Sequence, residues 1–344
     1  MKTFKAVLVG CGGISGTWLR AIRDIKGVKL TGLVDINIQA ARKCQETYKL
    51  VDTLVGDDLK WVLKNVKPDI VFNCTIPEAH KVVTLESLRH GCHVLSEKPL
   101  ADTMANAREM VTAAKKSGRI FAVMQNRRYD KNIHIFKNLI ASGKLGKLTT
   151  LNSDFYIGAH FGGFRVRMKH PLLLDMAIHT FDAARLISGA DPISVYCKEW
   201  NPQCSWYNHG ASAVAIFEMS GGIIYTYRGS WCAEGQNTEW AADWRAIATK
   251  GSAIWNGTSI LKAEKVAESK TAQFTSKRKQ LSIKTQSKGQ LEDHASCIKE
   301  FITSVRTGKA PHTICTDNIK SLAMILGAVK SAENGKTVRI NTAK

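Results

Sequence analysis

The sequence predicts an α/β protein in which a doubly wound parallel sheet precedes a second, α+β domain with a large, mostly antiparallel open sheet. Three observations support this prediction. An apolar run at residues 6–9 leads directly into a glycine turn, and strand-like runs alternate with helical patterns up to residue 124. After residue 190 strand-like runs follow one another with few helices between them. The predicted domains are residues 1–126 and residues 127–344.

The glycine turn is the first candidate site. Its spacing is Gly10-x-Gly12-x-x-Ser15, so a serine stands where the dinucleotide fingerprint has a third glycine or an alanine. Gly10 permits a tight turn, Gly12 permits close approach of a ligand, and Ser15 is small enough for close helix packing. A helix that begins here directs its N-terminus at a pyrophosphate.

The second strand, residues 29–34, ends in Asp35. At this offset from the glycine turn, an acidic side chain accepts hydrogen bonds from the adenosine ribose and repels the additional phosphate of NADP. The sequence therefore predicts a Rossmann domain over residues 1–126 that binds NAD in preference to NADP.

The remaining elements follow from apolar periodicity. In the first domain we expect further strands at residues 70–74, 93–95 and 120–124, and helices at 79–90 and 105–116. In the second we expect a helix at 132–142, strands at 148–156, 194–199, 213–218 and 223–231, and helices at 291–305 and 317–333. The two closing helices are candidates to pack back on the first domain.

Composition indicates a soluble, cytoplasmic protein, because 344 residues contain no apolar stretch of membrane-spanning length and no signal peptide. Nine cysteines without a Cys-x-x-Cys pair favour reduced thiols, and we predict no structural metal.

The net charge of +20 is unusual, and basic residues are densest between Lys262 and Lys288. No nucleic-acid-binding signature accompanies them, so we interpret them as a solvated surface that can steer anionic ligands, and we predict no nucleic-acid partner.

Two segments carry candidate chemistry. Lys98 directly follows the strand at 93–95, and ligands of open α/β sheets bind outside the carboxyl ends of the strands. Asp175, His179 and Asp182 share one face if they lie on an α-helix, and a carboxylate beside an imidazole suits proton transfer. A solvated lysine and a structural Asp–His pair are the alternative interpretations. A metal site is disfavoured because further ligands are not evident.

Together these segments resemble the Gfo/Idh/MocA family of nicotinamide-dependent oxidoreductases, which includes glucose–fructose oxidoreductase and inositol 2-dehydrogenase. The resemblance runs nearly end to end and rests on the order and spacing of its motifs. These motifs are Gly10-Cys-Gly12-Gly-Ile-Ser15, Asn73-Cys-Thr75-Ile-Pro77 with His80, Glu97-Lys98-Pro99, Gln125-Asn126-Arg127, Asp175-x-x-x-His179-x-x-Asp182 and Gly308-Lys-Ala-Pro311.

The resemblance implies that Lys98, Asp175 and His179 are the catalytic residues. The residues expected to bind the cofactor are Gly10, Gly12, Gly13, Ile14, Ser15, Asp35, Thr75, Pro77, His80, Glu97 and Asn126. The chain departs from many relatives before Asp175, where it reads His170-Pro-Leu-Leu-Leu and they have a glycine-rich stretch. The resemblance therefore implies less about the wall of the substrate pocket and about the identity of the substrate.

The expected reaction oxidises a secondary alcohol of a sugar, sugar derivative or cyclitol by hydride transfer to nicotinamide. We expect His179, oriented by Asp175, to act as the base while Lys98 hydrogen-bonds the reacting oxygen. Lys98 is the alternative base, because a desolvated lysine beside a cation loses its proton more readily.

Substrate contacts are expected from Arg127, Tyr156 and Arg165. An arginine there can bind a carboxylate or phosphate, although a solvated role is commoner. Tryptophans that could stack on a sugar, or lie in the core or a subunit interface, stand at positions 200, 206, 231, 240 and 244. By resemblance, residues 127–344 bind substrate and pair subunits into a homodimer or homotetramer.

Two other function classes stay open. Some relatives are glycoside hydrolases that oxidise their substrate transiently with bound NAD, and these would cleave glycosides without net NADH formation. Others bind a dinucleotide without turnover and act as regulators. The intact polar residues Lys98, Asp175 and His179 favour the dehydrogenase over both.

Overall fold

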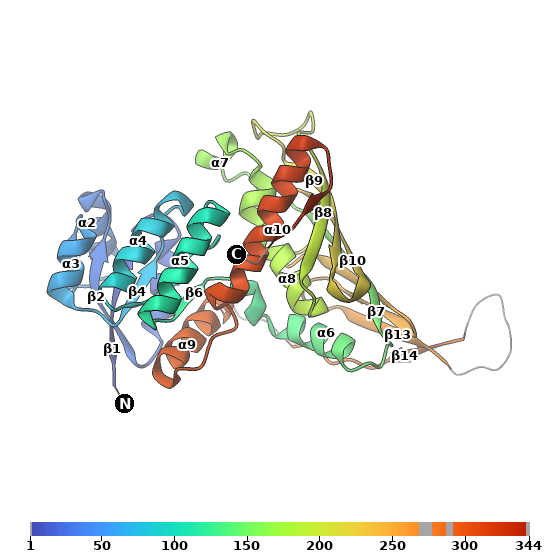
Figure 1. The fold of residues 1–344 in the computed structure, drawn as a ribbon, viewed down its shortest axis with the longest axis horizontal. Helices are drawn as coiled ribbons and strands as arrows, with labels where there is room; N and C mark the ends of the chain where they lie inside the picture. Colours follow the sequence, from blue (N-terminus) through green and yellow to red (C-terminus); the bar gives the residue numbers. More distant parts are fainter. Residues whose placement is uncertain (1, 268–276, 287–291, 342–344) are drawn as a thin grey trace. The chain divides into compact units, whose positions relative to one another are not determined.

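The computed structural model describes residues 2–267, 277–286 and 292–341 of the chain (Figure 1). They divide into one unit of residues 1–129 and 289–322 and a second of residues 130–288 and 323–344. Leu291, where a predicted helix begins, and residues 268–276 and 287–288 of the basic segment lie outside the described residues.

The first unit contains a six-stranded parallel sheet in the order β3-β2-β1-β4-β5-β6. The strands are β1 (Phe4–Val9), β2 (Val28–Val34), β3 (Leu54–Gly56), β4 (Ile70–Asn73), β5 (His93–Ser96) and β6 (Phe121–Val123). The order reverses between β1 and β4, which is the switch point where doubly wound sheets bind dinucleotides. This confirms the predicted parallel sheet.

Helices cover both faces of this sheet. They are α1 (Ser15–Arg23), α2 (Ile38–Thr47), α3 (Leu59–Val66), α4 (Pro77–Arg89), α5 (Met104–Ser117) and α9 (Glu292–Thr307), with a 3-10 turn η1 (Asn126–Tyr129). Ala6 and Leu8 of β1 share a core with α1 and α9, whereas Val7 and Val9 share one with α3 and α4. Burial on both faces explains why residues 6–9 of this strand are an unbroken apolar run.

The second unit contains a nine-stranded sheet in the order β14-β13-β12-β11-β7-β10-β9-β8-β15. The strands are β7 (Leu148–Tyr156), β8 (Pro192–Trp200), β9 (Ser212–Met219), β10 (Ile223–Ser230), β11 (Asp243–Ala248), β12 (Gly251–Trp255), β13 (Leu261–Val266), β14 (Arg278–Leu281) and β15 (Val338–Arg339). Only the pairing of β10 with β7 is parallel among these strands. The predicted, mostly antiparallel sheet is thus confirmed.

Helices cover one face of this second sheet. They are α6 (Lys131–Ala141), a π-helical turn η2 (Leu172–Ala177), α8 (Ile178–Ser188) and, from residue 323 on, α10 (Cys315–Asn334). The short elements α7 (Phe164–Arg167) and η3 (Ser220–Gly222) also belong to this unit. Phe155 and Phe217 of the sheet pack in one core with Phe181 of α8. Because side chains alternate along a strand, the residues between the buried ones form the opposite, outer face.

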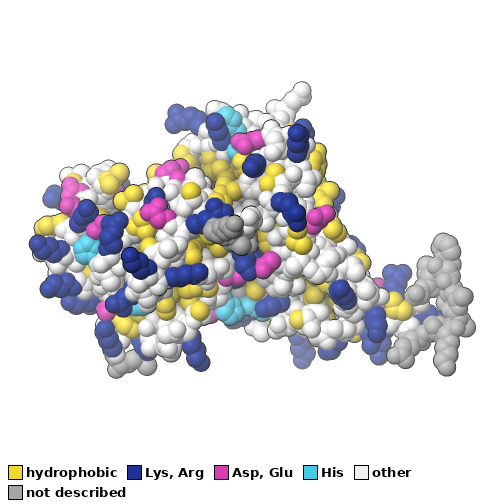
Figure 2. Space-filling view, viewed as in Figure 1, with side chains coloured by type: hydrophobic (Ala, Val, Ile, Leu, Met, Phe, Trp, Pro, Cys, Tyr) yellow, Lys and Arg dark blue, Asp and Glu magenta, His cyan; other side chains and the backbone are white. Residues whose placement is uncertain are grey.

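Two features of the composition, the cysteines and the charged residues, can be located in the structure. All nine cysteines are free, and seven of them are buried. Figure 2 shows lysine and arginine side chains spread over the visible face, with aspartate and glutamate among them. No helix within the described ranges is long and apolar enough to cross a bilayer.

His93 at the start of β5 makes the stability of the first unit depend on pH. The Ile120 amide donates a hydrogen bond to its Nδ1 at 3.0 Å, which requires that nitrogen to be unprotonated. Burial, with a smaller effect of Arg119, lowers the pKa of His93 from 6.5 to about 4.

The folded state therefore favours the neutral ring of His93. The stability that this preference gives the folded state is complete above pH 6.5 and is lost as the pH falls toward 4. We predict that urea unfolding of the wild type loses about 1 kcal/mol from this group by pH 5, after allowance for solvent screening. His93→Asn keeps an acceptor but cannot titrate, and should lose less over the same range. Equal losses in both proteins would contradict this assignment.

Candidate active site

The turn after β1 is shaped by backbone packing. Gly10 has φ +90°, and a Cβ added there would lie 2.7 Å from the carbonyl carbon of Cys74. At Gly12 and Gly13 an added Cβ would meet no atom within 4 Å. Position 10 thus requires glycine because two backbones meet, whereas the side of the turn at positions 12 and 13 is open to a ligand.

The N-terminus of α1 has no side-chain cap and is available to an anion. Its N-cap residue, Ile14, provides no side-chain hydrogen bond, and the first turn contains no acidic residue. Ser15 is buried, and its Oγ donates to the carbonyl of Gly12 at 2.6 Å, which holds the turn against the helix. Backbone N–H groups and the helix dipole at such an end fit the pyrophosphate of a dinucleotide.

Asp35 lies at the end of β2 beside this turn. Its Oδ2 accepts the Cys11 amide at 2.7 Å, and its Oδ1 accepts the Asn37 amide at 2.9 Å. Each carboxylate oxygen keeps a further acceptor position, as the two hydroxyls of an adenosine ribose require. The residues present around the turn therefore fit a bound NAD.

The loop after β4 is connected to the loop after β5 by His80. Thr75 Oγ1 donates to Asn73 Oδ1 at 2.7 Å. The ring of His80 lies fully buried between the carbonyl oxygens of Pro99, 2.8 Å from Nδ1, and Thr75, 3.0 Å from Nε2. Burial lowers the pKa of His80, so a neutral ring donates to one of the two carbonyls. His80 thus positions both loops. Pro77 is the first residue of α4, which lies between these two loops in the sequence.

Glu97 fixes the backbone of the candidate catalytic lysine. Its Oε1 accepts the indole N–H of Trp18 at 2.6 Å, and its Oε2 accepts the Lys98 amide at 3.1 Å. Glu97 and Trp18 are both buried. Trp18 was not among the predicted site residues, because its position in α1 gives only the apolar signal of a core residue.

In the second unit the predicted helix around Asp175 is not α-helical throughout. Asp175 lies in the π-helical turn η2, whereas His179 and Asp182 lie in α8. The assumed α-helical spacing is therefore wrong at Asp175, since a π turn has i→i+5 hydrogen bonds and a wider circumference. All three side chains are buried, and π turns occur frequently at functional sites.

Arg165 is paired with this segment. Its Nε donates to Asp175 Oδ2 at 2.6 Å, and 31% of its side chain is exposed. Arg165 is therefore paired and only partly exposed. By contrast, Tyr156 alternates along β7 with the buried Phe155, which places it on the outer face of the sheet, away from this pair. Asn126 and Arg127 lie in η1 of the first unit.

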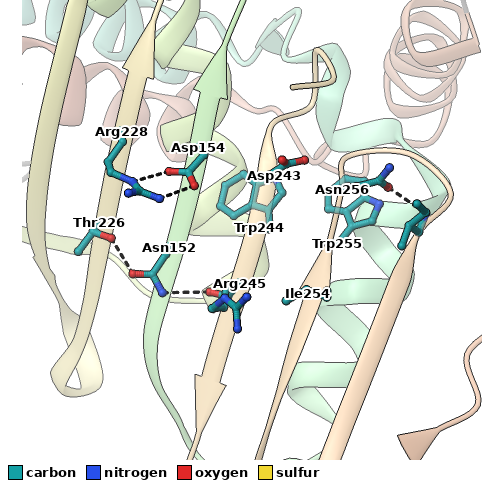
Figure 3. Close-up of a pocket in the computed structure, with 11 residues that line it drawn as sticks. Asn152, Asp154, Thr226, Arg228, Asp243, Trp244, Arg245, Ile254, Trp255 and Asn256 are labelled. Carbon is teal, nitrogen blue, oxygen red and sulfur yellow. Dashed lines mark hydrogen bonds and ion pairs between the residues drawn. The ribbon is translucent and has the colours of Figure 1, made fainter. Parts of the chain in front are cut away.

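The outer face of the second sheet contains a separate cavity of about 640 Å³ (Figure 3). Its lining includes Asn152, Asp154, Thr226, Arg228, Asp243 and Arg245. Figure 3 shows both guanidinium bonds of Arg228 to Asp154, at 2.7 and 2.6 Å. Burial and the nearby Asp154 raise the pKa of Asp243. The cavity contains none of the candidate catalytic residues.

The described residues contain no group of three or more histidine, cysteine, aspartate or glutamate side chains arranged to hold a metal ion. Asp182 and His179 are near each other in sequence, but no third ligand joins them in that part of the chain.

Comparison with known proteins identifies both units. Residues 4–125 match the family model described as the oxidoreductase family with an NAD-binding Rossmann fold, and residues 133–254 match the GFO/IDH/MocA C-terminal domain. The uncharacterized protein y4oX of Sinorhizobium fredii is 26% identical over 98% of this chain and 96% of its own length. The 1,5-anhydro-D-fructose reductase of Ensifer adhaerens is 24% identical over 97% and 98%.

Among solved structures, an oxidoreductase from Agrobacterium radiobacter in complex with NAD⁺, L-tartaric acid and magnesium has the same fold. The TM-score is 0.86 at 18% identity, and the match covers 98% of this chain and 99% of that one.

The position of Asp35 leads to a prediction about cofactor choice. Because its carboxylate is bonded to the glycine turn and an acidic residue at this position repels a 2′-phosphate, NAD should bind at least about tenfold more tightly than NADP, and Asp35→Ser should narrow that difference in affinity. Calorimetric titration with both cofactors measures it. Asp52→Ser, at an exposed site in the same unit, is the matched control. Tighter binding of NADP to the wild type would reject the assignment.

Proposed function

Since this chain belongs to the Gfo/Idh/MocA family of oxidoreductases, we propose that it is an NAD-dependent dehydrogenase that oxidises a secondary hydroxyl of a sugar, sugar derivative or cyclitol. Residues 1–126 form the NAD-binding domain in this proposal, and residues 127–344 form the substrate-binding and oligomerisation domain. The similarity to a 1,5-anhydro-D-fructose reductase supports this substrate class, because 1,5-anhydro-D-fructose is a sugar derivative.

The observation that carries the proposal is the position of Lys98. It follows β5 at the carboxyl edge of the parallel sheet, and β4 alone separates β5 from β1 and its glycine turn. Glu97 holds its backbone through a buried carboxylate that is itself bonded to α1. A lysine fixed beside a dinucleotide turn can hydrogen-bond a substrate oxygen and stabilise negative charge that develops on it.

The proposed reaction needs one base and one hydrogen-bond donor from the chain. Bound NAD⁺ supplies the hydride acceptor. His179 takes the hydroxyl proton, Asp175 orients its ring, and Lys98 hydrogen-bonds the oxygen as it becomes a carbonyl. Lys98 as the base is the alternative within the same proposal.

The decisive experiment is a substrate panel. Sugars, glycosides, uronates and inositols are incubated with NAD or NADP, and absorbance of the reduced nicotinamide is recorded. NADH formation from a polyol supports the dehydrogenase. Glycoside cleavage without net NADH would identify a hydrolase, and binding of NAD with no turnover of any compound would identify a regulator.

Substitutions test the assigned roles. Lys98→Met and His179→Asn should each lower kcat by about 10²-fold or more, because each removes a group that acts only on the reacting hydroxyl. NAD affinity measured by calorimetry should change by less than about threefold, since neither side chain is assigned to the pyrophosphate. Lys64→Met, in α3 of the first unit, is the control. Near-normal turnover in both variants would reject the site.

We further propose that the outer face of the second sheet pairs subunits in a homodimer or homotetramer. Large apolar side chains remain exposed on its strands, including Tyr196, Ile216 and Ile224. On the same face Arg228 is paired with Asp154, and Glu218, opposite Ile224, accepts a hydrogen bond from Ser194. A broad sheet face with exposed apolar residues is the kind of surface that a second copy covers.

Ile216→Lys should therefore shift the molecular mass measured by light scattering toward the monomer, because it places like charges in a symmetric contact. Val82→Lys introduces the same charge at an exposed apolar site in α4 of the first unit and should leave the mass unchanged. A wild type that is monomeric at micromolar concentration would disprove the interface.

A further inference from the structure

The guanidinium of Arg165 is held by three neighbours in the second unit. Its Nε donates to Asp175 Oδ2 at 2.6 Å. Its Cζ lies 4.7 Å from the ring centroid of Phe164 and 5.3 Å from that of Phe161. Cation–π contacts of this kind restrict a guanidinium more than solvent does, so Arg165 is oriented before any ligand binds.

The aromatic support of Arg165 is itself anchored. Phe161 meets Trp231 edge-on, with centroids 6.1 Å apart, and its centroid lies 6.2 Å from that of Trp240. Nevertheless 57% of Phe161 and 63% of Phe164 are exposed. The two exposed phenyl rings flank one half-buried arginine and form with it a contiguous apolar patch, and such patches mark ligand-binding surfaces more often than singly exposed residues do.

The terminal edge of Arg165 remains available. Within the described ranges, the hydrogen bond to Asp175 uses Nε, and neither Nη atom donates to a protein acceptor. That edge is a planar fork, and a planar carboxylate fits it with two parallel hydrogen bonds. The carboxylate of Asp175 is 11% exposed and already paired, so its charge is compensated and opposes an incoming anion less.

These contacts lead to a substrate class. As a deepening of the proposed function, on which it rests, we propose that Arg165 is a specificity residue that binds the carboxylate of an acidic sugar or polyol, such as a uronate or an aldonate. The fork lies beside Asp175, so the bound carboxylate and the hydroxyl to be oxidised belong to one small substrate. The net charge of +20 favours the approach of such an anion.

Binding is measured by calorimetry with the full chain and saturating NAD⁺, independently of turnover. Three matched pairs serve as probes: D-glucuronate with D-glucose, D-galacturonate with D-galactose, and D-gluconate with sorbitol. At least one acid should bind about tenfold or more tightly than its neutral partner, as expected for charge-assisted hydrogen bonds. D-glucose 6-phosphate is included to separate a carboxylate site from a phosphate site.

Variants locate the effect. Arg165→Gln should abolish the preference for the acid, and Arg165→Lys should restore only part of it, because an ammonium lacks the fork. Arg167→Gln removes the same charge from an exposed position of the same helix and should keep the full preference. Thermal unfolding of each variant verifies that it folds.

The results separate this inference from the proposed function. No preference for any acid, a preference that survives in Arg165→Gln, or tighter binding of the phosphate would overturn the carboxylate site, even if neutral polyols yield NADH. If instead the preference depends on Arg165 while no compound in the panel is oxidised, the site stands and the dehydrogenase proposal fails.

Discussion

The contact between Gly10 and the backbone of Cys74 is the constraint on which the first unit depends. β1 and β4 are hydrogen-bonded neighbours, and the turns that follow them meet where a Cβ would lie only 2.7 Å from a carbonyl carbon. A side chain at position 10 would push the turns apart. It would thereby disturb the Cys11 amide bonded to Asp35 and the loop that holds Thr75. The dinucleotide site is thus set first by packed backbone and then by side chains.

Lys98, the catalytic candidate at the same edge of the sheet, likewise depends on contacts between loops for its position. Buried polar groups must be paired, and here each pairing joins two loops. His80 connects the loop after β4 to the one after β5, while Glu97 connects α1 to the amide of Lys98. Lys98 is therefore placed by side chains that need never touch a substrate. Loss of one of them would misplace the ammonium rather than remove it.

In the second unit, strand alternation separates two roles on one sheet. The inner face packs against η2 and α8, so that Asp175 and His179 lie over a rigid aromatic core. The outer face keeps paired charges and exposed apolar residues that suit a contact with another subunit. Because both faces belong to the same strands, the proposed substrate site on one side and the proposed subunit contact on the other share one packed support.

The sequence by itself determined the parallel sheet, the glycine turn, Asp35 and the long strands of the second sheet, because each has a local signal of spacing or period. β14 has no such signal, since its four residues, Arg278–Leu281, read as a solvated basic segment until they pair with β13. Only the tertiary structure decided that Trp18 supports Glu97 and that Arg165 pairs with Asp175. Those partners are distant in sequence or reached across an irregular loop and a π turn, and no periodic pattern encodes such contacts.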